Sequence, residues 1–332
     1  MIGELQPAPW RQLAALRARL PHALLIHGAQ GVGKLALAEH FAQLLLCEVA
    51  GQGMEPCGAC SACRWFLGGN HPDVRYLEPE AFGRHAAQAD EEEATPAKGA
   101  KPSTEIKIEQ VRALTDFVNI GSHRGGRRVA IVHPAEDMNA ASANSLLKSL
   151  EEPPSGAFFL LVSHRPARLL ATIRSRCVAV PVPPPEPGAA EGWLAAQGVR
   201  EPARWLAFAG GAPRRALEIA RSDQAESIPA LLRALETGDF DAASAVPDRE
   251  TLELLAELLQ KLALDRAFGG LAGRPRFLPG LKFSGDAGPA QWLAFARAMG
   301  RNRLLTRHPL NPRLFAAEML SGFPVRLKTD LE

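Results

Sequence analysis

Two features that direct a protein to a membrane are missing from this 332-residue sequence. No run of apolar residues is long enough to cross a bilayer, which takes about 20 consecutive residues in a helix. The first residues also lack the basic stretch followed by an apolar stretch that is typical of a signal peptide. These absences argue against a membrane protein, so we expect no membrane partner and a cytoplasmic location.

A strong excess of either charge is also missing, because the net charge is only +2. Strong nucleic-acid binders concentrate positive charge, so contact with nucleic acid would need a local basic patch. Arg124, Arg127 and Arg128 form one basic cluster, and Arg165 and Arg168 form another. A solvated loop is the favoured interpretation of both clusters, and contact with DNA phosphates is the alternative.

Cysteine is scarce, with five residues, but four of them occur in one segment: Cys47, Cys57, Cys60 and Cys63. In a reducing compartment such a cluster binds metal more often than it forms disulfides. Four thiolates suit a structural zinc ion in tetrahedral coordination. An iron–sulfur cluster is the rival, although Leu67 stands where that type of motif would continue with another cysteine.

A short segment reads Gly-Ala-Gln-Gly-Val-Gly-Lys and has the pattern of a phosphate-binding loop between a strand and a helix. Its glycines, Gly28, Gly31 and Gly33, would let backbone N–H groups turn toward a phosphate, and Lys34 would reach the outer phosphates. A serine or threonine that binds magnesium normally follows this lysine, but Leu35 stands there. We therefore expect a degenerate loop, for which nucleotide binding stays an open question.

The acidic strand end that a magnesium-dependent ATPase of this type needs is missing as well. The corresponding strand is predicted to end in His133 and Pro134, and Glu136 and Asp137 follow three residues later. We expect these two carboxylates to be out of reach of the loop and to form a solvated turn. Together with Leu35, this pattern predicts that the chain does not hydrolyse ATP.

Buried apolar strands alternate with helical patterns in the first half of the sequence, which predicts a parallel α/β sheet covered by helices. Four strands are expected, in HALLIHG, RRVAIVHP, AFFLLVSH and RCVAVPV. The proline-rich segment that begins at Pro181 predicts a domain boundary, and only helical patterns follow it. Residues 83–104 are rich in alanine, proline, glycine and charge, so we expect a disordered insertion there.

Several motifs together resemble the delta-prime family of bacterial DNA polymerase III clamp-loader subunits: GAQGVGK, the four-cysteine segment, LLKSLEEPP and IRSRC, followed by a helical tail. The resemblance implies an AAA+ architecture. A RecA-like α/β domain at 1–181 would carry the zinc module at 47–63, a helical lid would occupy 182–224, and a helical collar for oligomerisation would occupy 225–332. It also implies a component of the DNA polymerase holoenzyme without intrinsic ATPase activity.

The resemblance further implies a ring with the gamma/tau motor subunits and the delta subunit, which opens the sliding clamp and places it on primed DNA. Within Ser175-Arg176-Cys177, Arg176 is identified as an arginine finger that acts in trans on the ATP site of the neighbouring motor subunit. A plain salt-bridged strand edge is the alternative interpretation of these residues. Two other functions stay open: an ATP-hydrolysing motor subunit of the same complex, and a zinc-bearing DNA-binding adaptor.

Overall fold

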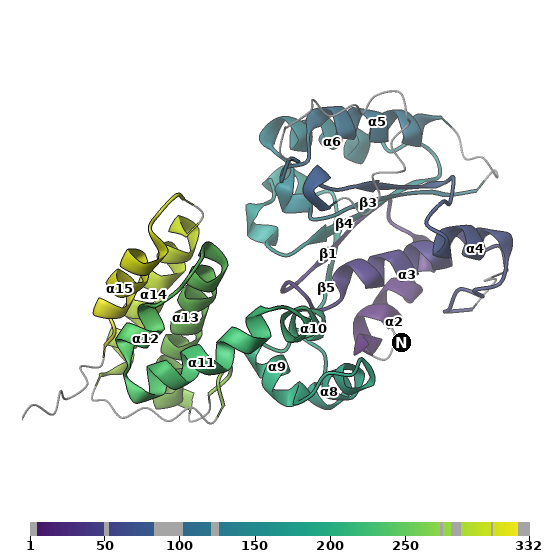
Figure 1. Ribbon diagram of the computed structural model, residues 1–332. Helices are drawn as coiled ribbons and strands as arrows, with labels where there is room; N and C mark the ends of the chain where they lie inside the picture. The colour runs from purple at the N-terminus through teal and green to yellow at the C-terminus, as the bar shows by residue number, and fades with distance from the viewer. Residues whose placement is uncertain are drawn as a thin grey trace, which may run out of the picture. The chain divides into compact units, whose positions relative to one another are not determined.

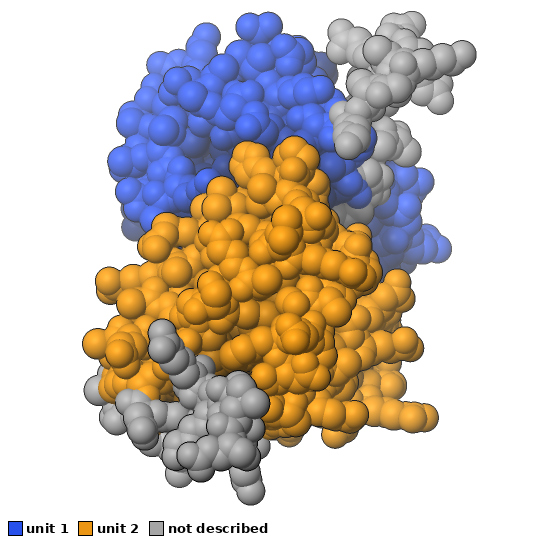
Figure 2. Space-filling view, turned by 60° about the vertical axis from the view of Figure 1, so that its left-hand side comes forward, with its two compact units in different colours: residues 1–186 blue, residues 187–332 orange. Residues whose placement is uncertain are grey.

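The computed structural model describes residues 5–49, 53–82, 102–120, 126–272, 275–279, 287–306 and 308–324. The chain divides into two compact units, Met1–Glu186 and Pro187–Glu332, which Figure 2 shows in blue and orange. The border between them falls inside the proline-rich segment that begins at Pro181. The further division of the second unit into a lid and a collar stays a prediction.

The first unit is built on a five-stranded parallel sheet in the order β2-β3-β4-β1-β5 (Figure 1). Its strands are β1 (Ala23–His27), β2 (Val74–Leu77), β3 (Arg128–Val132), β4 (Ala157–Ser163) and β5 (Val178–Pro181). All residues of β3 are buried, which explains why four apolar residues follow Arg128 without interruption. Four of these strands were predicted, and the edge strand β2 was not.

Helices cover both faces of the sheet. The α-helices of this unit are α2 (Pro7–Leu16), α3 (Lys34–Leu46), α4 (Ser61–Leu67), α5 (Ile108–Asn119), α6 (Ala140–Glu151) and α7 (Ala171–Arg174). Short 3-10 turns are η1 (Arg17–Arg19), η2 (Glu80–Phe82), η4 (Ala135–Asp137) and η5 (Pro166–Arg168). Figure 1 shows α5 and α6 on one face of the sheet and α3 on the other.

The helical faces predicted from residue spacing are the buried ones. On α3, the predicted residues Leu37, Phe41, Leu44 and Leu45 are all buried. On α6, Ala143, Leu146 and Leu150 enter the core between α5, α6 and the sheet, and Leu147 packs against that core while partly exposed. A repeat of three and four residues therefore located the core face of both helices.

Most of the segment expected to be a disordered insertion, residues 83–101, lies outside the described residues. Its C-terminal end is held in place by hydrogen bonds. The backbone N–H of Ser103 donates to the Glu80 carboxylate at 3.1 Å, and the N–H of Ala81 donates to the Ser103 carbonyl at 2.9 Å. The chain thus returns to η2 before α5 begins.

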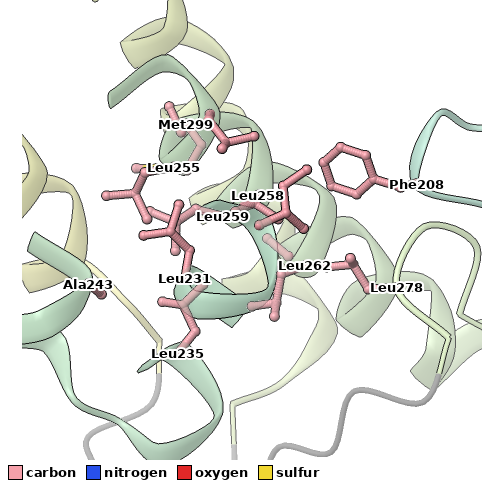
Figure 3. Close-up of a cluster of buried hydrophobic side chains, with 14 of the residues drawn as sticks. Phe208, Leu231, Leu235, Ala243, Leu255, Leu258, Leu259, Leu262, Leu278 and Met299 are labelled. Carbon is pink, nitrogen blue, oxygen red and sulfur yellow. The ribbon is translucent and has the colours of Figure 1, made fainter. Parts of the chain in front are cut away.

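The described part of the second unit contains helices and no strand. The helices are α8 (Pro187–Ala196), α9 (Pro202–Phe208), α10 (Pro213–Arg221), α11 (Gln224–Thr237), α12 (Phe240–Ser244), α13 (Arg249–Ala272), α14 (Pro289–Leu305) and α15 (Pro312–Ser321). They share one apolar core, in which Leu255, Leu258 and Leu262 of α13 lie among residues of the surrounding helices (Figure 3). Among the residues described, no helix has the length and apolar character that a membrane span requires.

A partly buried ion-pair network lies on one side of this core. Glu257 of α13 contacts Lys261 one turn further on, Arg303 of α14 at 3.2 Å and Arg215 of α10 at 4.0 Å. The Lys261 ammonium also lies 3.6 Å from the centroid of the Phe208 ring, which is a cation–π contact. Burial raises the pKa of Glu257, but Lys261, Arg303 and Arg215 more than offset this effect, so its pKa is lowered.

We expect Glu257→Ala to destabilise the helical unit by about 3–5 kcal/mol, because it leaves Lys261 buried without its carboxylate. Hydrogen exchange of the α13 amides would localise the loss to this unit. The control is Glu218→Ala, which removes an exposed partner of Arg215 at 3.6 Å and should cost about 1 kcal/mol or less. Equal hydrogen-exchange protection of the α13 amides in the Glu257→Ala and Glu218→Ala variants would contradict this expectation.

The pKa of Glu257 is lower in the folded chain than in the unfolded chain. Its contribution to stability is therefore present above the unfolded-state pKa and is lost as the pH falls through the folded-state pKa.

Candidate functional site

The glycine loop lies between the C-terminal end of β1 and the N-terminus of α3. Gly31 and Gly33 adopt φ values of 81° and 98°, a left-handed conformation that glycine adopts without strain. A Cβ atom on Gly28 would lie 2.2 Å from the carbonyl oxygen of Val182, so only glycine fits at that position. The loop therefore has glycine where its backbone requires it, and it lies at the edge of the sheet where parallel α/β proteins bind ligands.

The lysine of this loop is turned toward its own chain. Lys34 is only 2% exposed, and its ammonium donates a hydrogen bond to the carbonyl oxygen of Ala29. Burial lowers the pKa of Lys34 to about 8, although the nearby Glu136 carboxylate acts in the opposite direction. Much of the positive charge that would attract a phosphate is therefore lost as the pH rises above about 8.

Two histidines follow the neighbouring strands at the same edge of the sheet. His133 follows β3, His164 follows β4, and their ring centroids are 5.2 Å apart. Burial and the charge of Lys34 lower the pKa of His164 to about 4, so this imidazole is neutral near pH 7. Imidazole thus occupies the strand end where an active ATPase of this type would have a carboxylate.

The prediction that Glu136 and Asp137 form a solvated turn is wrong for Glu136. One oxygen of its carboxylate accepts a hydrogen bond from the backbone N–H of His164 at 2.9 Å. Its other oxygen is buried and has no hydrogen-bond partner among the described residues. Its charge also acts on Lys34, so the carboxylate lies near the glycine loop. Burial, followed by the charge of Glu136, raises the pKa of Asp137.

The segment Ser175-Arg176-Cys177 ends α7 in a turn in which each residue has a different environment. Ser175 donates a side-chain hydrogen bond to the carbonyl oxygen of Thr172 at 3.0 Å. Cys177 packs against the apolar core, and burial raises the pKa of its thiol to about 12. Between them, Arg176 is partly buried, with 34% of its side chain exposed.

The guanidinium of Arg176 has two partners in its own chain. One terminal nitrogen lies 2.6 Å from a carboxylate oxygen of Glu151, the last residue of α6, and the other donates to the Thr172 carbonyl at 2.9 Å. Glu151 was not predicted to be a functional residue. The indication of such a role in the sequence was its position within LLKSLEEPP, at the end of a helix with a buried face.

The four clustered cysteines lie close enough to bind one ion. All four sulfur atoms lie within 4.8 Å of one another, and the distances Cys47–Cys60 and Cys57–Cys63 are both 4.0 Å. Tetrahedral zinc with Zn–S bonds of about 2.3 Å requires sulfur atoms about 3.8 Å apart. Gly58, at φ 69°, makes the turn between the second and third cysteines. The cluster therefore fits a tetrahedral metal ion.

The pKa values of two cysteines in the cluster are shifted in opposite directions. Burial raises the pKa of Cys63 to about 12, and hydrogen bonding with Cys60 adds to this effect. Burial opposes ionisation of Cys47, but hydrogen bonds donated by the backbone N–H groups of Cys57 and Val49 more than offset it, so its pKa is lowered. A bound divalent ion would stabilise all four thiolates together.

Two contacts attach the cysteine segment to the helices beside it. The Arg17 guanidinium donates to the carbonyl oxygen of Gly53 at 3.0 Å, and His40 of α3 lies 2.7 Å from the Glu55 carboxylate. The cysteine segment thus packs against the same helix that begins at the glycine loop.

The two basic clusters have different environments, and the solvated-loop prediction is wrong for part of the first. Arg128 is only 3% exposed, lies 3.7 Å from Asp73 and stacks over Phe117. Half-buried Arg127 donates to the Leu45 carbonyl at 3.2 Å. Arg124 lies outside the described residues, whereas Arg165 and Arg168 are exposed, as expected.

These features define the class of the protein. A parallel sheet with β1 between β4 and β5, a glycine loop after β1 and a helical unit after β5 form the AAA+ fold that the sequence predicted. The profile of the family "DNA polymerase III, delta subunit" matches residues 7–186, more than half of the chain. The chain belongs to this family.

Curated relatives specify the resemblance further. The chain is 44% identical over 213 residues to the DNA polymerase III subunit delta' of Pseudomonas aeruginosa, covering 63% of this chain and 58% of that protein. It is 33% identical over 240 residues to the delta' subunit of Escherichia coli K12, covering 71% and 64%. The tau subunit of E. coli K12 is 34% identical over 160 residues, covering 48% and 21%. The alignments thus span less than two-thirds of each relative.

Proposed function

We propose that this chain is a non-hydrolysing, delta-prime-type subunit of a DNA polymerase III clamp loader. In that role it assembles with gamma/tau motor subunits and a delta subunit, and the complex places a sliding clamp on primed DNA. Arg176 acts in trans on the ATP site of the neighbouring motor subunit. Membership in the DNA polymerase III delta family supports this assignment.

One combination of residues carries the proposal. Both positions that would handle magnesium hold unsuitable side chains, Leu35 after the loop lysine and His133 at the strand end. In the same chain, half-buried Arg176 lies on a turn between Ile173 and Cys177, and both of these residues pack in the core beside the sheet. A chain without its own magnesium site but with a presented arginine suits a subunit that completes the ATP site of a neighbour.

The four-cysteine cluster is assigned a structural zinc ion. The four sulfur atoms surround one point, which suits a closed tetrahedral site without an open catalytic position. The ion would fix the loop between α3 and α4, and it takes no part in the chemistry of the proposed arginine finger.

The motor subunit is the second candidate, because the tau subunit of E. coli K12 aligns over 160 residues. We expect the purified chain to show no magnesium-dependent ATP hydrolysis above that of a Lys34→Ala variant. A hydrolysis rate that disappears with Lys34→Ala would favour the motor subunit and contradict the proposal.

Assembly is tested directly with the full chain. A tagged copy expressed in its native host should co-purify with gamma/tau and delta subunits. The reconstituted complex should load clamps on primed DNA, and omission of this chain should abolish loading. Loading at an unchanged rate without the chain would contradict the proposed role.

A further inference from the structure

Arg176 is contacted from two sides by its own chain. Glu151 lies 2.6 Å from one terminal nitrogen, and the Thr172 carbonyl lies 2.9 Å from the other. Thr172 precedes Arg176 by one helical turn, whereas Glu151 belongs to a different helix. The direction of the guanidinium therefore depends on how α6 and α7 pack together.

The position of Glu151 is fixed by the core beneath it. Leu146 and Leu150 of α6 are 0% and 1% exposed, and both lie in the same apolar cluster as Ile173 of α7. Glu151 directly follows Leu150 at the end of α6, so its backbone is anchored by this packing, while 47% of its side chain is exposed. A helix end that is held by packing in this way reduces the number of positions that the Arg176 guanidinium adopts.

The contact leaves donors available for a ligand. A guanidinium has five N–H groups; one terminal nitrogen donates to the Thr172 carbonyl, and the other lies 2.6 Å from a Glu151 carboxylate oxygen. The ion pair with Glu151 is formed at the terminal nitrogen that does not donate to Thr172. A phosphate can therefore approach the remaining N–H groups without displacing Glu151.

We propose that Glu151 is a positioning residue that orients Arg176 toward the terminal phosphate of a nucleoside triphosphate bound by the neighbouring subunit. This inference rests on the proposed function, because it requires Arg176 to act in trans. The carboxylate does not touch the phosphate. It limits the movement of the guanidinium, so less conformational freedom is lost when the transition state forms.

The test uses the reconstituted clamp-loader complex, assembled with wild-type chain or with one variant. Glu151→Ala removes the partner, and Glu151→Gln retains the length and one acceptor oxygen. Glu152→Ala is the matched control, because Glu152 is the adjacent exposed acid and lies outside the ion pair. Two quantities are measured: the rate of ATP hydrolysis and the number of ADP molecules trapped per complex with aluminium fluoride.

For Glu151→Ala we expect kcat at the adjacent site to fall on the order of tenfold. A tenfold loss of kcat is larger than the effect of removing one exposed ion pair and smaller than the effect of misplacing a catalytic group. The KM for ATP should change less than about twofold, because Glu151 does not contact the nucleotide. Trapping of ADP with aluminium fluoride should become weaker at one site per complex. Glu151→Gln should recover part of the activity, and Glu152→Ala should match the wild type.

The double variant Glu151→Ala/Arg176→Ala separates positioning from general structural support. If Glu151 acts only through Arg176, the double variant should be no slower than Arg176→Ala alone. Further loss in the double variant, or a loss with Glu152→Ala equal to that with Glu151→Ala, would overturn the positioning role. A higher rate with Glu151→Ala would also overturn it, because the carboxylate would then restrain Arg176 from reaching the phosphate. No effect of Arg176→Ala would instead contradict the proposed function itself.

Discussion

Replacing Arg176 with alanine is expected to leave the chain folded and assembled while strongly reducing ATP hydrolysis in the complex. Arginine fingers contribute on the order of 10³–10⁵-fold to the rate in related NTPases, so the adjacent ATP site should lose activity on that scale. The fold should tolerate the change, because Ile173 and Cys177 anchor the turn in the core and Arg176 lies at the surface. The ATP hydrolysis rate of the whole complex should fall by the fraction that this site contributes.

The measurement is steady-state ATPase of the reconstituted complex, with assembly checked by size-exclusion chromatography. Arg174→Ala is the matched control, since Arg174 is an exposed arginine at the end of the same short helix. Arg176→Lys should remain defective, because an ammonium does not reproduce the planar fork of a guanidinium. Wild-type rates in an assembled Arg176→Ala complex would exclude the finger.

Loss of the metal is the other large expected effect. Purified chain should contain one zinc ion, and Cys60→Ala should contain none. Structural zinc sites contribute apparent binding free energies of about 10–16 kcal/mol, so the cysteine segment should lose its fold without the ion. The sheet should remain folded, because the cysteines lie beyond the end of α3 and outside the sheet core.

Elemental analysis measures the zinc, and limited proteolysis measures the order of the segment. Cys177→Ala is the control, because this fifth cysteine packs against the sheet core instead of joining the cluster. It should retain one zinc ion and full resistance to protease. Iron in the wild-type chain, or zinc retained by Cys60→Ala, would contradict the assignment.

Local patterns predicted much of the first unit, and the missed strand shows where they become insufficient. Strands β1, β3 and β4 each contain at least four consecutive apolar residues, and the helices beside them repeat apolar residues every three or four positions. Strand β2 has four residues at the edge of the sheet, and its two central residues, Arg75 and Tyr76, are only partly buried. A strand of four residues is too short to show a distinctive period of apolar and polar residues in the sequence.

Charged residues were harder to predict because their environments come from distant parts of the chain. Arg128 is buried against Asp73, which lies 55 positions earlier in the sequence. Glu136 receives a hydrogen bond from the backbone N–H of His164 and interacts with Lys34. Charge in a sequence segment suggests solvent, and only the assembled sheet edge shows which carboxylates and guanidinium groups have internal partners.

Helix α3 joins the two sites of this unit, since Lys34 begins it and Cys47 follows its last residue. Thirteen residues at about 1.5 Å each make a rod of about 20 Å. One end is fixed by the contact of Lys34 with Ala29, and the other by the cysteine segment. Neither attachment requires a nucleotide. The position of this helix between the two sites is therefore set by contacts within the chain itself.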